Sequence, residues 1–260
     1  MKKSRLIYLI CSVIVMSLLL TFVLNYSTQY NFYLYAIIIL IIIPNFAMKR
    51  SERENLLHII GDYALTCDAL IYYERMEEFY KSLFLSKKNR KLNNINLALI
   101  KIELGEIEEA KKLLLEAKDL IDKARSFNRY NYFRAWCAIY YETMEVNHYA
   151  ILLEEMRKIV DENSDLGLKN QLITNFRIVE AKYFIMNGIY LDKARNVYSD
   201  ILNGETPPIM KLSSCYYLGV ISAKENKVSE AIEYFKKVAF TEKKIIIVTK
   251  AMKYIELLEK

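Results

Sequence analysis

The strongest constraint in this sequence is a helical hairpin pattern that recurs from residue 52 to the end of the chain. Its clearest copy covers residues 106–121, where apolar residues fall on one helical stripe and Glu and Lys fill the opposite stripe. The segment 95–104 has the same period, and Gly105 separates the two segments. Two helices joined by so short a turn lie antiparallel and in contact. The pattern therefore predicts a fold of stacked helix pairs.

Small residues recur at a fixed offset in these pairs, as close contact between two helices requires. Three such pairs are 12 positions apart, namely Ala98/Ala110, Ala138/Ala150 and Gly219/Ala231. A fourth pair, Ala181 and Ala194, is 13 positions apart, which predicts a turn one residue longer. With only 6 Gly and 3 Pro, the chain lacks the turn residues that β-sandwiches and barrels need at their corners. We therefore expect an all-α fold.

These residues resemble the tetratricopeptide repeat (TPR) family over most of residues 52–260. The family's Leu-Gly pair is matched at Leu218 and Gly219, and its Ala-x3-Phe element at Ala231 and Phe235. The Trp at the first position of the family's motif is missing from every repeat, and the Pro that closes the motif is present in only one repeat. The resemblance implies a TPR-like α-solenoid at residues 51–260.

The predicted repeats have the following bounds: 55–86, 91–124, 131–162, 174–207 and 212–243. A loop between repeats is expected at residues 162–169. The tail, residues 244–260, begins with a β-branched run that favours a strand, but its later apolar residues recur at helical spacing. We expect a C-terminal capping helix that covers the apolar face of the last repeat.

Two uncharged stretches precede the repeats, at residues 6–24 and 32–48. As helices they would be about 28 and 25 Å long, close to the hydrocarbon thickness of a bilayer. The first stretch exceeds the apolar region of a cleaved signal peptide, and no small-residue cleavage pattern follows it. Residues 25–31, also uncharged, suit a tight turn. We predict an N-terminal two-helix transmembrane hairpin at residues 1–50, with residues 6–48 in contact with membrane lipid.

Most of the formal net charge of +6 lies in the first 50 residues. These residues contain no acid and the following bases: Lys2, Lys3, Arg5, Lys49 and Arg50. Because basic residues stay on the cytoplasmic side, both termini and the solenoid are expected in the cytoplasm, in an integral protein of the cell membrane. The nearly neutral remainder has no basic stripe, which argues against nucleic-acid binding.

No motif in the sequence points to catalysis. An HExxH motif, a Cys/His cluster, a P-loop and a GxGxxG motif are all absent. The two histidines, His58 and His148, have no companion at metal-ligand spacing. Cys67, Cys137 and Cys215 are widely separated, as expected for buried free thiols in a reducing compartment. We expect no enzyme, no metal, no cofactor and no small-molecule substrate.

What remains is a binding surface. In TPR proteins the first helix of each pair lines the inner face, where peptides or partner helices bind. By repeat position, the resemblance implies a groove formed by Leu92, Ile95, Leu99, Tyr132, Trp136, Ile139, Asn175, Ile178, Lys182, Tyr216 and Val220. The family's carboxylate clamp is not matched, because Ile95 and Leu99 replace its Lys and Asn. An apolar, Tyr-rich groove suits an amphipathic or extended hydrophobic peptide. With 21 Tyr in the chain, packing of these rings between helices is an equal alternative.

The leading hypothesis is a membrane-anchored TPR scaffold or adaptor that binds a protein or peptide partner through its concave face. Two alternatives stay open at this point. One is a peptide-responsive or signalling regulator at the membrane. The other is an envelope-assembly factor with the solenoid outside the membrane.

Overall fold

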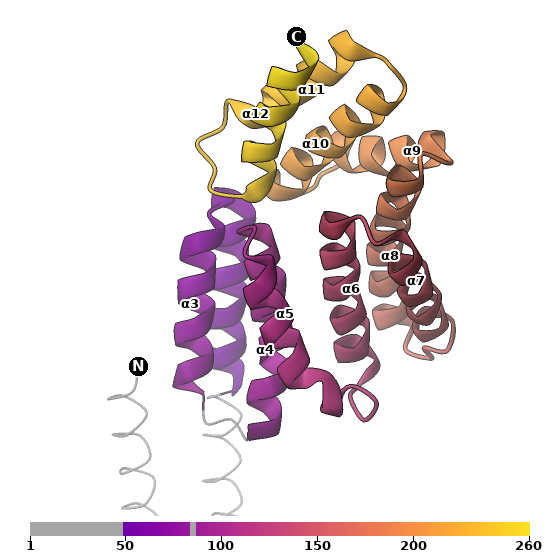
Figure 1. Ribbon diagram of the computed structural model, residues 1–260. Helices are drawn as coiled ribbons and strands as arrows, with labels where there is room; N and C mark the ends of the chain where they lie inside the picture. The colour runs from indigo at the N-terminus through magenta and orange to yellow at the C-terminus, as the bar shows by residue number, and fades with distance from the viewer. Residues whose placement is uncertain (1–48, 84–86) are drawn as a thin grey trace, which may run out of the picture. The chain divides into compact units, whose positions relative to one another are not determined.

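The computed structural model describes residues 49–83 and 87–260, and over these residues the predicted all-α class is confirmed (Figure 1). The predicted spans 6–24 and 32–48 lie outside the described residues. Among the residues described, no helix has the length and apolar character needed to cross a bilayer. The chain divides into two compact units. The larger unit, residues 60–80 and 85–260, carries the repeats; of the other, residues 49–59 and 81–83 are described.

The helices follow one another in pairs joined by short turns. Residues 49–66 are helical and precede α3 (Ala69–Ser82). The next helices are α4 (Lys87–Glu103), α5 (Ile107–Ala117) with a 3₁₀ turn (Lys118–Leu120), α6 (Ser126–Thr143), α7 (Val146–Asp161), α8 (Leu166–Asn187), α9 (Leu191–Asn203), α10 (Pro208–Lys224), α11 (Val228–Ala239) and α12 (Ile246–Leu258).

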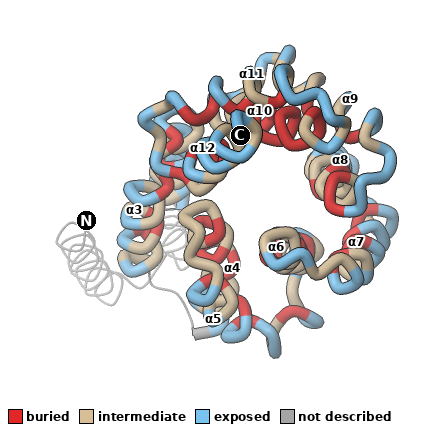
Figure 2. Tube along the Cα trace, turned by 45° about the horizontal axis from the view of Figure 1, so that its top comes forward, coloured by how far each residue is buried: buried red, intermediate tan, exposed pale blue. Residues whose placement is uncertain are grey.

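The helices from α4 to α11 pack in pairs: α4 with α5, α6 with α7, α8 with α9, and α10 with α11. In the larger unit, α4 also contacts α6, α6 contacts α8, and α10 contacts α12. The first helices of successive pairs therefore form an inner row, on which α12 completes the series (Figure 2). This arrangement is an α-solenoid.

A residue in the left-handed backbone region stands in each tight turn within a pair. These residues are Gly105 in α4–α5, Met144 in α6–α7, Gly188 in α8–α9 and Asn226 in α10–α11, and the α8–α9 turn also contains Tyr190 with φ 47°. Gly and Asn adopt this conformation readily. For a residue with a larger side chain, such as Met144, the left-handed conformation costs roughly 1–2 kcal/mol. The four residues recur at intervals of about 40, longer than the 34-residue TPR period.

The core is distributed between neighbouring helices. One buried cluster joins α4, α5 and α6, a second joins α6, α7 and α8, and the third extends from α8 to α12. Tyr130, Tyr149 and Tyr198 are fully buried in these clusters, and the Tyr149 hydroxyl donates a hydrogen bond to the Val179 carbonyl oxygen at 2.7 Å. Cys67, Cys137 and Cys215 are buried free thiols.

The segment before α12 contacts the start of the repeats. The Ala69 N–H donates to the Lys244 carbonyl oxygen at 3.4 Å, and the Lys244 ammonium lies 3.6 Å from the Asp68 carboxylate. The side chain of Ile246 lies against the turn at Gly105. Because Cys67 and Ala69 belong to the same buried cluster as Ile245, the two ends of the larger unit share one core.

Several predicted boundaries differ from the structure, because α4, α6, α8 and α10 begin before the predicted repeat starts at residues 91, 131, 174 and 212. The loop expected at residues 162–169 is shorter, since α8 begins at Leu166. The Asp165 carboxylate accepts a hydrogen bond from the Leu168 N–H at 3.0 Å and caps the helix. The β-branched run after Ile245 is helical, because Ile247, Val248 and Ala251 are buried against the preceding pair.

The contact at Gly219 gives a test of the packing between α10 and α11. A Cβ atom at Gly219 would lie 2.8 to 3.0 Å from three atoms of the Phe235 ring, which is itself fully buried. We expect Gly219→Ala to lower the free energy of unfolding by about 1–3 kcal/mol through overpacking. The measurement is urea unfolding of the full chain followed by circular dichroism.

Gly61→Ala is the matched control. Gly61 is also helical, but no atom lies within 4 Å of its Cβ position. This substitution should raise stability by about 0.5–1 kcal/mol through helix propensity. Equal effects of the two substitutions would contradict the close approach of α10 and α11.

Candidate functional site

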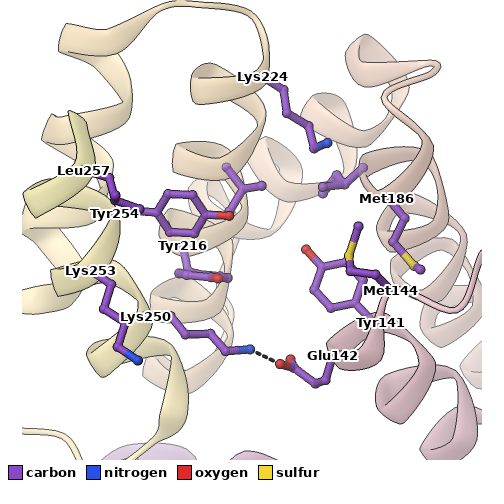
Figure 3. Close-up of a pocket in the computed structure, with 12 residues that line it drawn as sticks. Tyr141, Glu142, Met144, Met186, Tyr216, Lys224, Lys250, Lys253, Tyr254 and Leu257 are labelled. Atoms are coloured by element: carbon purple, nitrogen blue, oxygen red, sulfur yellow. Dashed lines mark hydrogen bonds and ion pairs between the residues drawn. The ribbon is translucent and has the colours of Figure 1, made fainter.

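The larger unit has a cavity of about 350 Å³ on its inner face. This volume is at the low end of the range for ligand sites in proteins. The cavity lies among the ends of four helices of the inner row, α6, α8, α10 and α12 (Figure 3). Its lining residues are Tyr141, Glu142, Met144, Ile185, Met186, Tyr216, Val220, Lys224, Lys250, Lys253, Tyr254 and Leu257.

The apolar walls of the cavity combine rigid and adaptable side chains. Ile185 and Val220 are buried and belong to the core cluster beneath. Met144 and Leu257 are 59% and 67% exposed, and Met186 is buried. Thioether side chains adjust their shape to a ligand at low cost, so the cavity is able to accept apolar groups of differing form.

Three tyrosines bring hydroxyl groups to the cavity. Tyr216 and Tyr254 pack against each other with ring centroids 6.3 Å apart, and Tyr254 stacks on Phe235 at 4.7 Å. Tyr141 stands on the opposite wall, on α6, and its hydroxyl points toward the space between the helices (Figure 3). None of the three hydroxyls has a hydrogen-bond partner in the described part of the chain. They are therefore available to a ligand.

These hydroxyls stay protonated at physiological pH. Burial raises the pKa of Tyr141, Tyr216 and Tyr254, and the nearby Glu142 carboxylate raises each of them further. A protonated phenol donates a hydrogen bond. The three groups thus act as donors toward any acceptor that enters the cavity.

The charges at the cavity are unequal. The Lys250 ammonium on α12 pairs with the Glu142 carboxylate on α6, and both side chains are about three-quarters buried (Figure 3). Lys224 and Lys253 are exposed, and neither forms an ion pair with a described residue. The cavity rim therefore carries two uncompensated positive charges.

A second group of charges lies deeper in the inner row. The Lys182 ammonium lies 4.8 Å from the centroid of the Tyr217 ring. Burial lowers the pKa of Lys182 and of Arg134, and it raises the pKa of Glu103. The opposite charges of Lys182 and Arg134 partly offset the effect of burial on Glu103.

Two of the residues predicted to line a groove, Tyr216 and Val220, line this cavity. Lys182 lies behind it, near Tyr141 and Tyr217, while Ile178 packs on the core and Asn175 is half-buried. The other six form part of the cluster between α4, α5 and α6: Leu92, Ile95, Leu99, Tyr132, Trp136 and Ile139. Tyr132 is buried there, and Trp136 lies between the rings of Tyr132 and Tyr140. The structure does not bring the eleven residues together.

Sequence reasoning missed the contribution of α12 because this helix was expected only to cover the last repeat. Its cavity residues are Lys250, Lys253, Tyr254 and Leu257. They are spaced i, i+3, i+4, i+7, which places them on one helical face. The buried residues Ile247, Val248 and Ala251 form a different stripe. In the sequence of α12, Tyr254 and Leu257 share a helical face with two lysines, and this pattern could have identified the four residues as part of a site.

Comparisons with known proteins found no match among family models, curated proteins or solved structures.

The buried tyrosines predict a loss of stability at alkaline pH. Burial raises the pKa of Tyr80 to about 12, and it raises that of the fully buried Tyr149 well above the ordinary value. In the unfolded chain both groups ionise near pH 10. Their contribution to stability is therefore complete below pH 10 and is lost as the pH rises through the folded-state pKa values.

The measurement is the phenolate absorbance and the urea midpoint across this range. We expect delayed ionisation in the folded protein and ordinary ionisation in urea. If all tyrosines of the folded protein titrated near pH 10, the burial of these rings would be contradicted.

Proposed function

We propose that the chain is a TPR-like scaffold that binds a short segment of a partner protein in the cavity between α6, α8, α10 and α12. The observation that carries this proposal is the backbone of Met144. This residue adopts φ 59°, at a turn position where other pairs have Gly105, Gly188 and Asn226. A side chain kept at an energetic cost is a recurrent feature of binding sites. Here the costly side chain forms part of the cavity wall.

The lining supports a peptide as the ligand. Exposed Met144 and Leu257 leave the apolar walls accessible from solvent, while the tyrosine hydroxyls supply directional hydrogen bonds. A few fixed polar groups within an apolar lining are typical of selective sites. Helical peptides present apolar side chains to such surfaces at i, i+3 and i+4, and extended peptides present alternate side chains.

We infer from the sequence that residues 6–24 and 32–48 anchor this scaffold in the cell membrane, with the repeats in the cytoplasm. The support is the absence of charge in both stretches and the bases Lys2, Lys3, Arg5, Lys49 and Arg50 that flank them. Anchoring holds a weak binder near other membrane proteins and so raises its effective concentration. We therefore expect the partner to act at the membrane.

Met144→Gly tests the cavity as the binding site. The substitution relieves roughly 1–2 kcal/mol of left-handed strain but adds about 0.5–1 kcal/mol of backbone entropy cost, so the free energy of unfolding should rise by up to about 1 kcal/mol. It also removes a cavity wall, so affinity for peptides selected from a display library on the full chain should fall about tenfold, the worth of a buried apolar side chain. Affinity is measured by fluorescence anisotropy and stability by urea unfolding.

Asn226→Gly is the matched control. Asn226 also occupies a turn between paired helices with φ 59°, it is exposed, and it does not line the cavity. It should leave affinity unchanged. A more stable Met144→Gly chain that binds as tightly as the wild-type chain would contradict the proposal, because unfolding cannot mask that result.

Fusions after Lys260 test the membrane arrangement. A fluorescent protein that matures only in the cytosol should be fluorescent, and a phosphatase that requires export should be inactive, because the flanking bases resist transfer across the membrane. The measurement is whole-cell fluorescence and phosphatase activity, with expression of both fusions checked by immunoblot. An active phosphatase on a non-fluorescent chain would contradict the cytoplasmic placement.

A further inference from the structure

The polar side chains that line the cavity are mainly cations and hydrogen-bond donors, and this composition indicates the charge of the ligand. Lys224 and Lys253 are unpaired cations, and Tyr141, Tyr216 and Tyr254 are protonated donors without partners in the described chain. The lining carboxylate, Glu142, is already paired with Lys250. A basic ligand would find no free carboxylate among the lining residues. An acidic ligand would find cations and donors together.

On this basis, and resting on the proposed function, we propose that the bound segment is an acidic peptide in which an apolar side chain is flanked by carboxylates. In Figure 3, Lys224 lies on one side of the Tyr254 ring and Lys253 lies on the other. Met144 and Met186 line the cavity on the side opposite Tyr254 and Leu257 (Figure 3). The apolar side chain would occupy the space between them, and carboxylates on either side would reach the two ammonium groups.

One effect opposes an anion here. Lys224 ends α10, Met144 caps the C-terminus of α6, and Met186 and Leu257 lie in the last turns of α8 and α12, so the partial negative charges of four helix ends lie near the cavity. This effect is limited to the last turn and is screened by salt. A carboxylate that contacts a lysine ammonium forms a charge-assisted hydrogen bond, roughly twice as strong as a neutral one. The lysines therefore outweigh the helix ends.

The same chemistry favours a carboxylate over a phosphate. No arginine lines the cavity, so the planar fork that suits phosphate recognition is missing from the lining residues. No helix N-terminus, with its free backbone N–H groups, contributes a lining residue either. Single ammonium groups and phenol donors suit the smaller charge of a carboxylate.

The experiment uses three sets of fluorescent peptides that share a central Leu, Met or Phe. The flanking positions are Asp and Glu in the first set, Asn and Gln in the second, and Lys and Arg in the third. Binding to the full chain is measured by anisotropy at low and at moderate salt. We expect the acidic set to bind about tenfold more tightly than the amide set, with an advantage that shrinks as salt rises.

The decisive variant is the double charge reversal Lys224→Glu with Lys253→Glu. It should lose the acidic set and gain the basic set, a gain that an unfolded chain cannot show. Lys112→Glu with Lys123→Glu makes the same change in net charge at exposed lysines that do not line the cavity, and it should keep the acidic preference.

The outcomes separate the two proposals. The amide or the basic set could bind the wild-type chain as tightly as the acidic set, with binding weakened by Met144→Gly. That result would overturn the proposal of an acidic ligand but leave the proposed peptide site standing. If Met144→Gly weakened the binding of none of the sets, both proposals would be overturned. An equal loss of acidic preference in the Lys112/Lys123 variant would also overturn the assignment of the rim lysines.

Discussion

Each helix pair in the larger unit has an apolar face that only a neighbouring pair can bury, and the rest of the structure depends on this requirement. The three buried clusters each span successive pairs, so no single central core exists among the described residues. Buried rings fill much of this space, as with Tyr130, Tyr149 and Tyr198. The abundance of tyrosine is thus in part a packing solution, in which the aromatic ring is buried. The hydroxyls of Tyr130 and Tyr149 donate to the Leu172 and Val179 carbonyl oxygens, whereas the buried Tyr198 hydroxyl has no partner among the described residues.

Helix α12 packs one stripe of buried residues against the pair formed by α10 and α11. Its second stripe then faces the inner row, where Lys250 reaches Glu142 on α6. The segment at Lys244 joins the start of the repeats through Asp68 and Ala69. Helix α12, which contributes buried residues to the core, therefore also supplies a third of the cavity lining. The same helix thus both buries the apolar face of the α10–α11 pair and forms part of the site.

The helix pairs could be predicted from the sequence because apolar period and small-residue spacing are local properties. The close approach at Gly219 illustrates this, although the atoms nearest to its Cβ position belong to the Phe235 ring. The cavity could not be predicted in the same way, because it depends on how far each pair rotates on the next. Ile95, Leu99 and Ile139 occupy groove positions by repeat register, yet they pack between helices. Tyr216 and Val220 hold the corresponding positions and line the cavity.

The site combines properties that arise from independent parts of the chain. The strained turn comes from α6, the unpaired lysines from α10 and α12, and the free hydroxyls from all three helices. The strained side chain is not needed to stack the pairs, since Gly105, Gly188 and Asn226 stand at the same position in the other turns of α4 to α11. A strained Met144 costs about as much stability as a helix cap contributes. These features surround one cavity, and together they are the support for the proposal that a ligand binds there.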